Sequence, residues 1–147
     1  MLRPANAVAF VFLCALGAGV AVADHDPDDR PPMAARDKLR IVVIDPRGPV
    51  KAGVETKFTI QIELEFGSAK EGVARVGFNV DSPTSSRMID SRDLREGRQQ
   101  FSFVVKVMPV DWADRGDFAV MVNMGPKTTA SLWAPTAYVH KTIAVKR

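Results

Sequence analysis

Strict alternation of apolar and polar residues over short segments is the dominant pattern of this chain. The clearest case is the segment 57–66, whose apolar members are Phe58, Ile60, Ile62, Leu64 and Phe66. The segments 101–107 and 118–124 alternate in the same way. Because successive strand side chains point to opposite faces, this pattern predicts antiparallel strands with one buried and one solvated face.

Four weaker segments, 39–44, 73–80, 87–90 and 138–145, complete the set, and stretches rich in Gly and Pro separate several of them. No segment has convincing helical periodicity. Seven short strands spaced about ten residues apart are typical of a β-sandwich. We therefore expect residues 38–147 to form an all-β, seven-stranded antiparallel Greek-key sandwich of the immunoglobulin type.

The segment 114–120, Asp-Arg-Gly-Asp-Phe-Ala-Val, resembles the Asp-X-Gly-X-Tyr-X-Cys motif that leads into strand F of immunoglobulin domains. Phe118 stands in place of the Tyr and Val120 in place of the Cys. The resemblance implies that this chain lacks two stabilising features of immunoglobulin domains and must replace them. Phe118 cannot make the tyrosine-corner hydrogen bond, and packing of Val120 against Ile60 or Ile62 must replace the inter-sheet disulfide. The chain is most similar to cysteine-free bacterial immunoglobulin-like and fibronectin type III-like modules, whose shared fold does not specify a role.

The first 23 residues have the features of a secretory leader. Arg3 precedes an apolar run over 7–23, which ends in the small-residue triplet Ala21-Val22-Ala23. We expect cleavage after Ala23 and a periplasmic or secreted protein with no stable membrane span. An uncleaved anchor is the less favoured alternative, because the apolar run is short for a bilayer. Residues 24–37, acidic and rich in Pro, are expected to be a disordered tail.

Composition and motifs narrow the functional classes. The formal net charge of +3 is small and scattered, so we expect no nucleic-acid partner. Cleavage after Ala23 would remove Cys14, the only cysteine, and with it any disulfide or thiolate site. The two histidines are His25, in the tail, and His140, which is most simply a solvated strand residue. With no catalytic motif present, we expect neither an enzyme nor a cofactor.

The segment 125–136 is long for a connection between two strands, and long loops on rigid scaffolds often carry binding residues. We expect a noncovalent binding or assembly module that contacts another exported or cell-envelope protein through this loop, with Leu132, Trp133 and Lys127 as candidate contacts. Trp133 covering one end of the core is the alternative for that side chain. The second candidate surface is a sheet edge. The run 86–98 alternates in charge sign, as a solvated edge strand does.

A copper-binding protein is the alternative function. Cleavage after Ala23 would expose Asp24 and His25, whose amine, imidazole and carboxylate groups are plausible Cu(II) ligands. Met121 and Met124 do not extend this site, since alternation places them on opposite faces of one strand. Asp111, Asp114 and Asp117 have a spacing that calcium could use, but turn and capping roles are the favoured interpretation.

Overall fold

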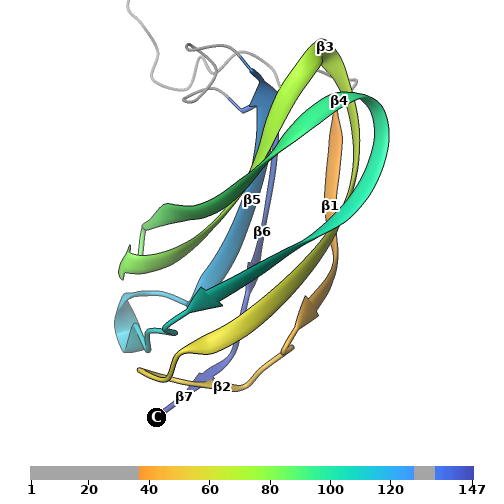
Figure 1. Cartoon of the computed structure of the whole chain (residues 1–147). Coiled ribbons are helices and arrows are strands. Elements are labelled where there is room, and N and C mark those ends of the chain that lie inside the picture. The colour runs from red at the N-terminus through yellow and green to blue at the C-terminus, as the bar shows by residue number, and fades with distance from the viewer. Residues whose placement is uncertain (1–36, 128–134) are drawn as a thin grey trace, which may run out of the picture.

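The computed structural model describes residues 37–127 and 135–147 (Figure 1), and this part of the chain is all-β, as the alternation predicts. The strands are β1 (Lys38–Asp45), β2 (Val50–Lys51), β3 (Thr56–Ser82), β4 (Ser85–Val107), β5 (Ala119–Pro126), β6 (Ala137–Thr142) and β7 (Val145–Lys146), with one 3-10 turn at Ala113–Arg115. Within these ranges no helix has the length and apolar character needed to cross a bilayer.

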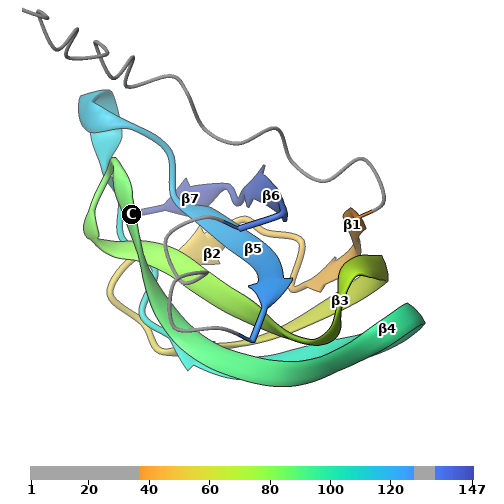
Figure 2. The ribbon, with the colours of Figure 1, turned by 90° about the horizontal axis from the view of Figure 1, so that it is seen from above.

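Two long strands, β3 of 27 residues and β4 of 23, form an antiparallel hairpin and dominate the structure. The first half of β3 pairs with β1 and with the second half of β4. The second half of β3 pairs with the first half of β4 and with β5, which in turn pairs with β6. Because both long strands bend midway, a single antiparallel sheet curls around the core (Figures 1 and 2). This arrangement is compatible with a β-sandwich.

The predicted strand boundaries at the bend are wrong. Segments 57–66 and 73–80 were expected as two strands separated by Gly67 and Gly72, yet they belong to one strand, and 87–90 and 101–107 are likewise both in β4. A Cβ on Gly72 would lie 2.5 Å from the Cζ atom of Phe66, so this glycine lets the strand fold closely over the phenylalanine ring. Gly97, the register partner of Phe66, has a φ of +115°, which only glycine adopts easily. Glycine at these two positions therefore permits a bend rather than a turn.

The core confirms the predicted inward faces. Phe58, Phe78 and Phe118 pack together, with ring centroids 5.2 to 6.3 Å apart. Offset and tilted aromatic contacts of this kind add to the free energy gained by burial. Val120, Ile60 and Ile62 are fully buried in the same core. The alternating segments thus supply the interior from both halves of the sheet.

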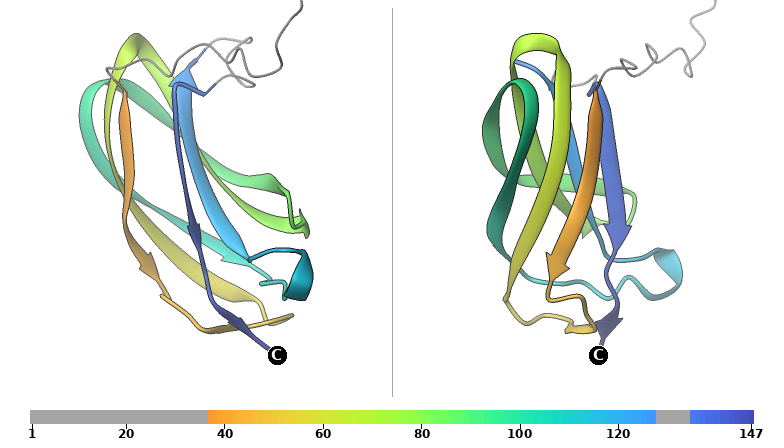
Figure 3. Two further views of the ribbon diagram at one scale, coloured as in Figure 1. Left: turned by 180° about the vertical axis from the view of Figure 1, so that it is seen from behind. Right: turned by 90° about the vertical axis from the view of Figure 1, so that its right-hand side faces the viewer.

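The two ends of the described chain close one side of the molecule. β2 pairs in parallel with β7, and the Val50 amide donates a 2.9 Å hydrogen bond to the Ala144 carbonyl. The single last strand expected over 138–145 is instead β6 and β7, interrupted where the Ile143 amide donates to the Phe118 carbonyl at 2.8 Å. β1 also lies beside β6 (Figure 3). We call this side the closed side.

Candidate binding surface

The predicted contact residues are only partly within the described chain. Leu132 and Trp133, like Asp24 and His25, lie outside the described residues. Lys127 follows β5, where its Nζ atom is 2.9 Å from Asp93 Oδ2 and its amide donates to the Glu71 carbonyl. The hydrogen bond that Lys127 donates to Asp93 raises the pKa of Lys127. Lys127 therefore contacts β4 through its side chain and β3 through its backbone at the start of the long loop.

β4 forms the opposite, open side of the molecule. Within residues 37–127 and 135–147 it pairs only with β3, so its other edge lies free along both halves of the curled sheet (Figure 2). We call this the β4 edge. An unpaired edge presents backbone N–H and C=O groups to which another strand can be added.

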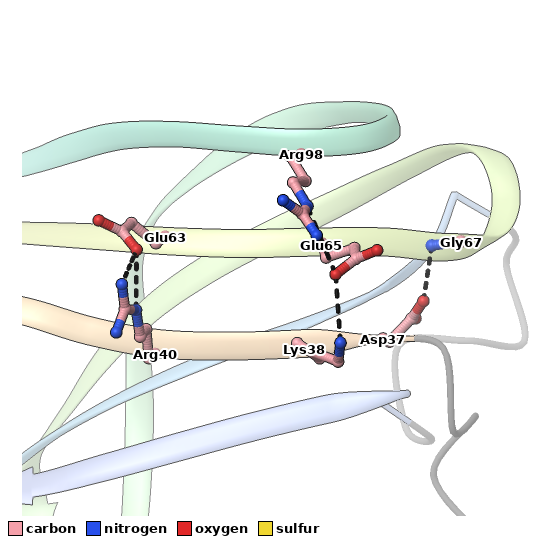
Figure 4. Close-up of polar contacts among 7 residues, drawn as sticks. All are labelled: Asp37, Lys38, Arg40, Glu63, Glu65, Gly67 and Arg98. Atoms are coloured by element: carbon pink, nitrogen blue, oxygen red, sulfur yellow. Dashed lines mark hydrogen bonds and ion pairs between the residues drawn. The ribbon is translucent and has the colours of Figure 1, made fainter.

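Charged side chains along the β4 edge are mostly directed back onto the protein. The ion pairs are Arg87–Asp81 at 3.4 Å, Arg98–Glu65 at 3.7 Å and Lys106–Glu55 at 3.3 Å. Glu65 also pairs with Lys38, beside the Arg40–Glu63 pair on the outer face of the sheet (Figure 4). Most of these groups are well exposed, with Glu63 and Glu65 half-buried, and such pairs contribute little stability. They shape the charge of the surface more than they hold the fold.

An apolar groove lies at one end of the β4 edge. It encloses about 660 Å³, and its apolar lining is Val80, Ile89, Val107, Met108, Pro109 and Val110. Met108 is 56% exposed, the largest exposed fraction among the exposed large apolar side chains of the described residues. Ile89 and Val107 come from opposite ends of β4, and only the bend in that strand brings them to one place. The groove therefore has no signal in the order of residues along the chain.

Asn79 is a buried polar residue that fixes the backbone around Phe118. It is 5% exposed, and its Nδ2 donates to the Asp117 carbonyl at 2.6 Å while its Oδ1 accepts from the Ala119 amide at 2.7 Å. The Asn79 carbonyl also accepts a hydrogen bond from the indole of Trp112, whose side chain packs in the core. One amide side chain therefore holds the backbone on both sides of Phe118. The available signal was a polar residue inside the apolar run 76–80.

Asp37 binds the bend of β3 from outside. Its carboxylate accepts hydrogen bonds from the Gly67 amide at 2.7 Å (Figure 4), from the amide and hydroxyl of Ser68, and from the Thr136 hydroxyl. Burial raises the pKa of Asp37, but these hydrogen bonds together outweigh burial and hold it below its ordinary value. Asp37, which was assigned to the tail, is thus attached to the domain.

Within the described ranges, no three His, Cys, Asp or Glu side chains gather in a way that could hold a metal ion. Asp111 instead accepts from Arg147 Nε at 2.6 Å and from the Ala113 amide at 3.0 Å. The hydrogen bond from Arg147 is the main cause of the lowered pKa of Asp111. The aspartate thus takes part in the turn and in a surface ion pair.

Comparison with known proteins finds no matching family model, no matching curated protein and no matching solved structure. Function must therefore be inferred from the residues and their geometry.

Proposed function

We propose that this chain is an exported, noncovalent binding or assembly module that contacts a protein partner through the β4 edge and the apolar groove at its end. The partner is another exported or cell-envelope protein. The observation that carries the proposal is the proximity of an unpaired strand edge to an apolar hollow of about 660 Å³.

The chemistry of strand addition fits this surface. An extended segment that pairs with a sheet edge gains affinity from main-chain hydrogen bonds, and pockets for its side chains supply specificity. Here the β4 backbone would supply the main-chain hydrogen bonds, and the groove around Met108 and Val110 would supply the pocket for a side chain. We expect the partner to present an extended segment with an apolar side chain.

The charges of the β4 edge limit which partners fit. Arg92, Asp93, Arg95 and Glu96 alternate in sign near the bend. Charges of this kind discourage indiscriminate pairing of sheet edges, and they favour a segment with the complementary order of charges. The edge is therefore suited to one partner and protected against general aggregation.

The proposal includes a fold and a location. We propose the seven-stranded, immunoglobulin-like Greek-key sandwich, with the two halves of β3 and of β4 each counted as separate strands and the two-residue strands β2 and β7 not counted. The division of the curled sheet into two parts supports this fold. One half of β3 and of β4 lies with β1, and the other half of each lies with β5 and β6. The leader over 1–23 supports export, with cleavage after Ala23.

The test is site-specific cross-linking of the full chain in the exported protein fraction of its source. A photo-reactive amino acid is placed at Met108 in the groove, at Trp133 in the long loop, or at Val42, which is 41% exposed on β1 and serves as the control. We expect a discrete adduct from Met108 and none from Val42. We also expect Met108→Asp to weaken binding of the identified partner by roughly tenfold or more, as loss of an interface anchor does.

Two outcomes contradict the β4 proposal. An adduct from Trp133 without one from Met108 would assign binding to the loop of Leu132 and Trp133. Equal adducts from Met108 and Val42, or none from any position, would remove a specific interface on β4.

A further inference from the structure

The two halves of the β4 edge differ in how well they are protected against another strand. The half before the bend, over 87–98, is densely charged, and its pairing with β3 has register shifts at Phe66/Glu71 and Val76/Gly77. The half over 99–107 has a single charged residue, Lys106, and pairs with β3 without any shift. Charges and bulges are the usual means of keeping a further strand from a free edge. The half over 99–107 is therefore the part of the edge that another strand can join.

Apolar side chains on both faces of this half are incompletely covered. Val104 is 52% exposed on the outer face, between the buried Phe103 and Val105. On the inner face Phe101 is only partly buried, with the Phe103 ring 5.4 Å away and the Arg92 guanidinium 5.6 Å from its centroid. Side chains of a neighbouring strand would lie next to both residues, because cross-strand pairs contact on each face of a sheet.

We propose that the strand added to this half is the β4 strand of a second copy of this chain, antiparallel to the first about a two-fold axis at Val104. A two-fold axis brings the same surface of both copies together, so the surface must be complementary to itself. The inference rests on the proposed function, since it uses the same edge and groove and identifies the exported partner as a second molecule of this chain.

The residues over 100–108 are complementary to themselves in this register. Val104 lies opposite its own symmetry mate, Ser102 opposite Lys106, and Phe101 opposite Val107. Lys106 is the only charged residue over 100–108, so no like charges meet. Because directly opposed residues share a face, the inward side chains of both copies stay on the inner face.

The groove favours this axis over its neighbours. Val107 lines the groove, so Phe101 of each copy supplies the apolar side chain that the groove of the other receives. An axis at Ser102 would instead set Arg98 against Lys106, two like charges. An axis at Phe103 would set Phe101 against Val105, which does not line the groove.

β1 offers a matched comparison. Within the described residues it also pairs along one edge alone, and its Val42 is 41% exposed. However, a register shift between Ile41 and Val43 interrupts its ladder, and β6 lies beside it. We therefore expect no second copy at β1, and Val42 is the control position for Val104.

The first test is sedimentation equilibrium of the full chain with Cys14→Ser, which prevents disulfides through the native cysteine. We expect a monomer–dimer equilibrium. Val104→Asp sets two carboxylates directly opposite each other and should weaken dimerisation roughly tenfold or more, whereas Val42→Asp should leave it unchanged. A circular dichroism spectrum checks that each variant is folded.

The second test is disulfide formation between copies in the same Cys14→Ser background, with glutathione as the oxidant. Opposed residues of antiparallel strands are close enough for a disulfide, so Val104→Cys should give a covalent dimer and Val42→Cys should not. Ser102→Cys and Lys106→Cys should cross-link when mixed, and neither should do so alone. This pattern reports the register directly.

The inference is overturned if the chain is monomeric, if Val104→Asp dimerises as the parent does, or if Val42→Cys cross-links as readily as Val104→Cys. The photo-reactive group at Met108 separates this failure from failure of the proposed function. An adduct of Met108 with a different protein would overturn the two-fold dimer alone. Absence of both the dimer and any Met108 adduct would overturn both proposals.

Discussion

The two sides of the curled sheet differ in what covers them, although β1 and β6 on the closed side also each pair along one edge alone within the described residues. On the closed side, β2 and β7 pair, and Ile143 is buried with its amide bonded to Phe118. On the open side, the β4 edge has no partner strand within the described residues and carries exposed charges. Both sides surround the same core. The closed side therefore contributes mainly to stability, whereas the open side is available for contacts.

The largest effect on stability is expected from a substitution in the closed side. Ile143→Ala removes a side chain that is 2% exposed, and we expect a loss of about 2–4 kcal/mol in the free energy of unfolding. Val104→Ala, on β4 and 52% exposed, should cost no more than about 0.5 kcal/mol. Urea unfolding of both variants measures the contrast. Equal losses would mean that the two sides are not energetically distinct.

Asn79→Ala should have the next largest effect, because it leaves the Ala119 amide and the Asp117 carbonyl without their partner. We expect a loss of about 2 kcal/mol, the usual cost of leaving buried polar groups unpaired. Asn123→Ala, on the outer face of β5, is the matched control and should change stability little. A variant at Asn79 as stable as the control would show that the backbone around Phe118 does not need this amide.

Asp37→Asn tests the end of the closed side where Asp37 bonds to the bend of β3. We expect a loss of about 1 kcal/mol in the free energy of unfolding at neutral pH. The folded pKa of Asp37 is lower than its unfolded pKa, so its contribution is present above about pH 4 and disappears as the pH falls through the folded pKa. The difference between parent and variant in the free energy of unfolding, measured by urea denaturation, should therefore become smaller at acidic pH. A difference that stays constant with pH would contradict a role for the carboxylate charge.

The smallest effect is expected on the open side, at the equivalent end of the sheet. Lys127 and Asp93 form an exposed ion pair, so Lys127→Ala should leave the urea midpoint unchanged within error. Raising the salt concentration should make no further difference between parent and variant. A clear loss of stability that salt abolishes would show that this pair fastens β4 after all.

Local patterns in the sequence predicted the inward faces well. The side chains at Phe58, Ile60 and Ile62 were identified because strand alternation depends only on neighbouring residues, and the structure confirms their burial. The division at Gly67 and Gly72 was wrong because a glycine that permits a close bend has the same local signal as one that makes a turn. Lys127 was named from the sequence as a candidate contact, a role that stays a prediction, and its hydrogen bond to Asp93 could not be predicted because the two residues are far apart in the chain.

By itself, the sequence determined that this is an all-β protein with antiparallel strands and a shared apolar interior, since each of these follows from the order of residues along a strand. Only the tertiary structure decided where the bend lies, which side is closed and which residues from distant segments meet. The groove lined by Ile89 and Val107 depends on the bend and the register of β4. Register is fixed by the simultaneous packing of all strands around one core, and no single segment contains that information.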